Sequence, residues 1–171
     1  MATNLRLLHK IENRSAVTNL EISNVFSADY DIYKVTISNG TISGNADYHT
    51  FRVMNSSGSD SGSNYVHASL QIPSHQVEFE GKSTGTTHFQ FGGRMGGNHQ
   101  EGVGHDVYFF NPFDSTKFTY IINASSSFEV GTALYGFQGI CVHKVQESIL
   151  GFSMHRTGSF VNFDVSVFGV E

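Results

Sequence analysis

The densest group of chemically capable residues lies at 98–106, which reads NHQEGVGHD. His99, Glu101 and His105 offer two imidazoles and a carboxylate, which are groups that bind zinc and similar divalent ions. Their spacing matches no established metal motif, and the cysteine half of a zinc deaminase signature cannot exist in a chain with one cysteine. We therefore expect a solvated glycine-rich loop, with no metal and no cofactor, and regard these three residues as the only candidates for an enzyme site.

Other catalytic patterns are missing from the sequence. No Gly-x-Ser-x-Gly nucleophile elbow occurs, and the glycine-rich GGRMGG segment lacks the lysine of a phosphate-binding loop. Cys141 lies in GICVHKV, which matches no cysteine-enzyme motif, so we expect a small buried side chain. His67 and His88 lie opposite the apolar phase of their predicted strands and should face solvent. The sequence thus favours a protein that is not an enzyme.

A cluster of aromatic residues suggests binding instead. Tyr108, Phe109 and Phe110 are followed by Asn111, Pro112 and Phe113, which is more aromatic surface than a strand with one buried face requires. We expect a contact between subunits here, to which the apolar start of the chain also contributes. The residues of this contact would be Leu5, Leu7, Tyr108, Phe109, Phe110 and Phe113. A sugar site is the alternative, and its candidate residues are Tyr108, Asn111 and Asp114.

The elements that position these residues are strands. Apolar and polar residues alternate at period two in Asp31 to Ser38 and in Val161 to Val170, which is typical of strands with one buried face. Twelve such segments are spaced about ten residues apart and separated by turn residues, and no helical stripe is sustained. We expect an all-β, antiparallel, jelly-roll-like β-sandwich whose core includes Tyr33, Val35, Val53, Leu70, Phe89, Phe91, Ile122, Phe163 and Val165.

Length and charge limit the remaining possibilities. The 171 residues fit one domain spanning residues 1–171, and a formal net charge of -5 provides no basic surface for nucleic acid. No segment has the apolar length of a membrane span or a signal peptide. The single cysteine excludes an internal disulfide, which agrees with assembly in a reducing cytosol.

The order of motifs resembles that of small structural proteins of tailed bacteriophages, particularly those that infect marine cyanobacteria. The resemblance is carried by FSADYDIYKVTISN, HTFRVMNSSGSDSGSNYVHAS, FNPFDSTKFTYIINASSS and the closing GFSMHRTGSFVNFDVSVFGV. Its individual features are Tyr30 with Tyr33, the segment Arg52 to Asn64, the Gly158-Ser159 turn and the Phe168-Gly169-Val170 step.

This resemblance implies a β-sandwich carried on a virion as a tail, fibre-associated or capsid-decorating subunit. It supplies no catalytic residues. We expect a homo-oligomer that contacts other virion proteins, assembles in the host cytoplasm and does not insert into membranes. A carbohydrate-binding module that recognises a host surface glycan is the alternative function.

Overall fold

The computed structural model describes residues 4–13, 15–44, 48–90, 92–97, 102–129 and 133–171. In this part of the chain every regular element is a strand. The strands are β1 (Leu5–Asn13), β2 (Val17–Ile22), β3 (Ile32–Ile42), β4 (Thr50–Asn55), β5 (Gly58–Ser59), β6 (Tyr65–Pro73), β7 (Phe79–Thr86), β8 (Phe89–Gln90), β9 (Val103–Phe110), β10 (Thr119–Glu129), β11 (Ala133–His143) and β12 (Gly151–Val170). The predicted all-β fold is confirmed.

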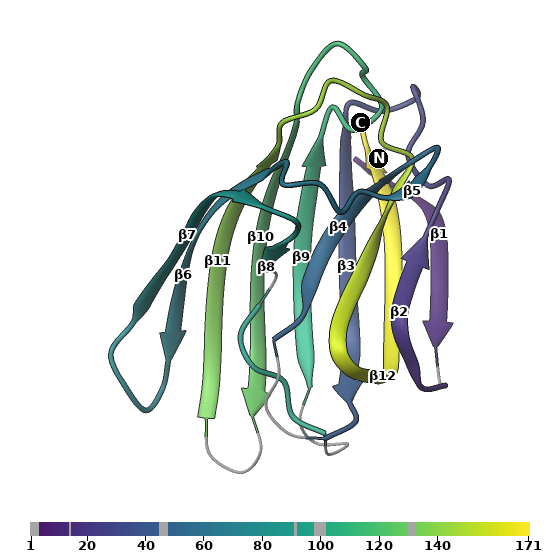
Figure 1. Cartoon of the computed structure of the whole chain (residues 1–171). Coiled ribbons are helices and arrows are strands. Elements are labelled where there is room, and N and C mark those ends of the chain that lie inside the picture. The colour runs from purple at the N-terminus through teal and green to yellow at the C-terminus, as the bar shows by residue number, and fades with distance from the viewer. Residues whose placement is uncertain (1–3, 14, 45–47, 91, 98–101, 130–132) are drawn as a thin grey trace.

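All strand pairings are antiparallel and belong to one sheet that curls into a half-barrel (Figure 1). The main path runs β5-β4-β12-β3-β9-β10-β11-β6-β7, while β1 and β2 pair with β12 and β8 pairs with β4. The structure is thus sandwich-like, although its two layers are continuous parts of one sheet.

Strand β12 connects the two layers. The sequence predicts separate strands at Leu150 to His155 and Ser159 to Phe168, but the structure joins them in one element of 20 residues. Its first part pairs with β2 and β4, and its second part pairs with β1 and β3. Figure 1 shows β12 bending between these parts, which closes the half-barrel on that side.

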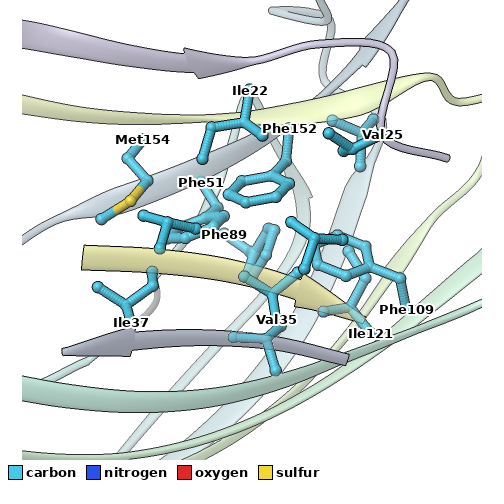
Figure 2. Packing of buried hydrophobic residues seen from close by; sticks show 14 of the residues in the cluster. Ile22, Val25, Val35, Ile37, Phe51, Phe89, Phe109, Ile121, Phe152 and Met154 are labelled. Atoms are coloured by element: carbon cyan, nitrogen blue, oxygen red, sulfur yellow. The ribbon is translucent and has the colours of Figure 1, made fainter. Parts of the chain in front are cut away.

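Phenylalanine rings from both layers fill the space between them. Phe152 of β12 stacks on Phe51 of β4 at 5.4 Å and on Phe109 of β9 at 5.6 Å between ring centroids. Figure 2 shows this packing, in which Phe89, Val35 and Ile121 also take part. Each such side chain contributes about 1.5–3 kcal/mol when it is fully buried.

Six of the nine predicted core residues are buried, namely Tyr33, Val35, Val53, Phe89, Phe163 and Val165. Phe91 lies outside the described residues. The prediction is wrong for Ile122, which is 48% exposed, and for Leu70, which is only half-buried. Both lie on the outer side of the sheet, where β10 and β6 present apolar residues outward.

Candidate functional site

The predicted metal group is not assembled in the described structure. His99 and Glu101 lie outside the described residues. His105 is on β9 and only 4% exposed, so the expectation of a solvated loop is wrong for this residue. Its Nε2 atom lies 2.7 Å from Nε2 of His49, which is also buried. One ring must donate this hydrogen bond and the other accept it, so the two rings cannot both be imidazolium cations.

Burial and the adjacent His49 lower the pKa of His105 well below its ordinary value. The segment that covers this pair contains Gly92. A Cβ atom at Gly92 would lie 2.8 Å from Cε1 of His105 and 2.9 Å from Cε1 of His49. Only glycine allows the backbone to approach the rings so closely. The paired histidines therefore form part of a closely packed polar interior.

Each of the three predicted sugar-binding residues has a different role in the fold. Tyr108 lies on the outer side of β9, with the Lys34 ammonium 5.6 Å from its ring centroid. Asn111 has a left-handed φ of 51° in the turn after β9. Asp114 accepts hydrogen bonds from the backbone N–H and hydroxyl of Thr116 and pairs with Lys117. Its carboxylate thus stabilises a turn.

The predicted interface residues fall into two groups. Phe109 is fully buried against Phe26 and Phe152, so it is removed from any contact with another molecule. Because neighbouring residues of a strand face opposite sides, the two aromatic residues beside it point outward. Tyr108, Phe110 and Phe113 are partly exposed, and Leu5 and Leu7 are exposed. The structure therefore leaves five of the six at the surface.

The outer side of the adjoining strands is more apolar than the sequence analysis anticipates. We call this surface the outer apolar face. Its residues are Tyr108 and Phe110 of β9, Tyr120, Ile122, Ala124 and Phe128 of β10, Leu134, Ile140 and Val142 of β11, and Val66, Ala68, Leu70 and Ile72 of β6. Tyr120, Ile140 and Val66 border a groove of about 380 Å³ on it.

The inner side of β6 and β10 carries several polar residues. Asn123, Ser127 and Gln71 are buried there, and His67 lies in the same row as buried Cys141. The expectation that His67 faces solvent is therefore wrong, because β6 presents its apolar phase outward instead of inward. His88 is also half-buried, and burial is the main cause that lowers the pKa of both rings. Cys141 is buried as expected, and burial raises its pKa.

Two further polar groups form only through the fold. Ser59 Oγ lies 2.6 Å from Ser153 Oγ, which lies 2.7 Å from Nε2 of His155; Nδ1 of that ring is 3.1 Å from Asn19 Oδ1. This order matches a nucleophile, a base and an orienting group. Ser153 is fully buried, however, so its hydroxyl cannot meet a substrate without movement of the sheet. The group is better explained as a structural hydrogen-bond chain.

The second group contains Asp60, His143 and Glu147, whose ligand atoms lie within 4.8 Å of one another. Asp60 and His143 are 83 positions apart in the chain. No local motif signals this convergence, so spacing in the sequence does not predict it. One feature of this group is visible in the sequence, since His143 and Glu147 are four positions apart.

No helix in the described part of the chain has the length and apolar character needed to cross a membrane. Comparison with known proteins finds no matching family model and no match among curated proteins.

Proposed function

We propose that this chain is a non-enzymatic structural subunit that assembles with copies of itself through the outer apolar face. The observation that carries the proposal is that β6, β10 and β11 direct large apolar residues outward, while β6 and β10 bury the polar residues Gln71, Asn123 and Ser127 inward. Sheets of isolated domains ordinarily do the opposite. A second layer over the outer side would remove this apolar surface from water.

The size of the surface suits a subunit contact. Exposed fractions are 60% for Ile140, 54% for Ile72, 53% for Tyr120, 50% for Leu134 and 48% for Ile122. With Phe128 these residues expose about 600 Å², taking roughly 200 Å² for each fully exposed large side chain. This is at the upper end of the largest patch on typical monomers, and a standard interface buries about 800 Å² per partner.

The order of residues on the outer apolar face favours a second copy of the chain as the partner. One cross-strand row runs Lys34, Tyr108, Ile122, Ile140, Ala68 and Lys82, and the next runs Asp106, Ala124, Gln138, Leu70 and Glu80. A twofold axis lying across the strands would place each row over the other row of the partner. Lys82 would then face Glu80 of the second copy, and the large Ile122 and Ile140 would meet small Ala124 and unbranched Gln138.

A twofold axis along the strands is disfavoured by charge. It would superimpose each row on the same row in reverse order, which brings Lys82 opposite Lys34. Like charges in such positions oppose association. We therefore infer a face-to-face dimer with the axis across the strands, as the building unit of a larger assembly.

The virion setting of this proposal comes from the sequence resemblance to small structural proteins of tailed bacteriophages. The half-barrel would provide a rigid support, and the connecting segments at its ends would contact other virion proteins. In this proposal the subunit assembles in the host cytoplasm, and its final location is the virion.

Analytical ultracentrifugation of the purified chain at micromolar concentration tests the proposal. The wild type should sediment as a dimer or larger species, and Ile122→Ser with Ile140→Ser should sediment as a folded monomer. Val77→Ser is the matched control, because Val77 is 81% exposed but lies outside the face. Lys82→Glu should weaken assembly, and adding Glu80→Lys should restore it.

A monomeric wild type would contradict the assembly proposal. In that case the alternative, a carbohydrate-binding module, gains support only if the wild-type protein binds on a glycan array and Tyr108→Ala abolishes that binding.

A further inference from the structure

We propose that Asp60, His143 and Glu147 bind one divalent transition-metal ion, and we call them the carboxylate-histidine site. This inference is independent of the assembly proposal, because these residues lie outside the outer apolar face. They come from three places in the chain. Asp60 follows β5, His143 ends β11, and Glu147 lies in the connection from β11 to β12.

Both carboxylates converge on the same ring nitrogen. Nε2 of His143 lies 2.5 Å from Oδ2 of Asp60 and 3.8 Å from Oε1 of Glu147. The imidazole itself is fully buried, while the Asp60 and Glu147 side chains are 14% and 25% exposed. One nitrogen carries at most one proton, so it can donate to only one of the two carboxylates.

A single metal ion beside Nε2 would engage all three groups at once. It would accept one lone pair from the imidazole and one from each carboxylate, with the proton of the ring on Nδ1.

The carboxylates are already held in place by donors outside the cluster. Asp60 accepts hydrogen bonds from the Gly62 backbone at 2.7 Å and the Asn64 side chain at 2.9 Å. Glu147 uses Oε2 to accept a bond of 2.8 Å from Asn55, which leaves Oε1 directed at the histidine. Such outer contacts orient metal ligands and strengthen binding.

One imidazole nitrogen and two carboxylate oxygens form a ligand set suited to zinc, with water completing the coordination from the partly exposed carboxylate side.

The expected role is structural. A bound ion would attach the Ser- and Gly-rich segment at 56–64 to the end of β11, beside the backbone bond of 2.9 Å from Lys144 N–H to the Asn64 carbonyl. Because the ion would bind the folded chain and not the unfolded one, it should raise the melting temperature.

Isothermal titration calorimetry of the EDTA-treated, tag-free chain with zinc chloride tests the site, with melting followed by circular dichroism. The wild type should bind one zinc ion per chain and melt at a higher temperature with zinc. Glu147→Gln and Asp60→Asn should each weaken binding by roughly tenfold or more, the size of effect known from losing even an outer-shell partner. Both substitutions keep side-chain size, so the folded state should be retained.

Glu129→Gln is the matched control. Glu129 is a partly buried carboxylate that pairs with Arg94 at 3.3 Å, and its loss should leave zinc affinity unchanged. Cobalt substitution supplies a second readout, since the wild type should give visible absorption bands that Glu147→Gln reduces. The proposal is overturned if the wild type binds no zinc, or if zinc binds equally well to wild type, Asp60→Asn and Glu147→Gln.

Discussion

Gly92 is a residue at which the fold tolerates little change. Its backbone lies against the edges of the His49 and His105 rings, and an added methyl group would also lie 3.0 Å from Ser125 Oγ. The rings cannot retreat easily, because they are buried and hydrogen-bonded to each other. Overpacking of this kind typically costs about 1–3 kcal/mol.

We therefore expect Gly92→Ala to lower the free energy of unfolding by about 1–3 kcal/mol in urea denaturation. Gly104→Ala is the control, since a Cβ atom there would meet nothing within 4 Å. Equal midpoints and slopes for the two variants would show that the segment containing Gly92 does not pack on the histidines as described.

At the scale of the elements, β10 separates two neighbouring isoleucines. Ile121 points into the core and is 1% exposed, whereas Ile122 points outward and is 48% exposed. Truncating a buried isoleucine typically costs about 2–5 kcal/mol, because both transfer energy and packing are lost. Truncating a half-exposed side chain leaves little cavity.

Ile121→Ala should thus destabilise the dilute monomer by about 2–5 kcal/mol, and Ile122→Ala by less than about 1 kcal/mol. Chemical denaturation at low protein concentration measures both values, and sedimentation measures assembly. The opposite order of stabilities, with Ile122→Ala the more damaging, would mean that β10 has the reverse register.

The period-two alternation predicts most strands but not always which side is buried. Polar residues flank Val35, Phe163 and Val165 on both sides in the sequence, and Tyr33 is followed by a lysine, so these side chains are placed correctly from sequence. In β10 both phases carry isoleucine, and in β6 the apolar phase faces outward, so the alternation misplaces Ile122 and Leu70. Strand pairing, which depends on the whole sheet, decides the side in these elements.

The polar groups show a different limit of sequence reasoning. His49 meets His105 across 56 positions, and Asp60 meets His143 across 83. Such contacts depend on the order of strands in the sheet, which local spacing does not contain. His99, Glu101 and His105 are close in sequence and predict a shared loop, yet β9 directs the side chain of His105 into the interior.

At the scale of the whole molecule, the interior holds several titratable rings. Burial is the main cause that lowers the pKa of His67, His88, His105 and His155, and Arg52 adds to the effect for His88 and His155. In the unfolded chain these rings regain an ordinary pKa of 6.5. Below that pH the unfolded state binds more protons than the folded state, so acid favours unfolding.

The free energy of unfolding should accordingly be fully retained above pH 6.5 and should fall as the pH drops below it. From pH 7.5 to pH 5.5, His105 should account for a loss on the order of 1 kcal/mol, with smaller losses from the other three rings. Urea denaturation at both pH values, at one low protein concentration and with EDTA present, keeps assembly and metal binding out of the comparison.

His105→Gln should reduce the difference in unfolding free energy between the two pH values even if it lowers stability at both, whereas His9→Gln, at an exposed position, should leave this difference unchanged. A wild-type chain equally stable at both pH values would contradict the burial of neutral histidines, and with it the polar interior that accompanies the outer apolar face.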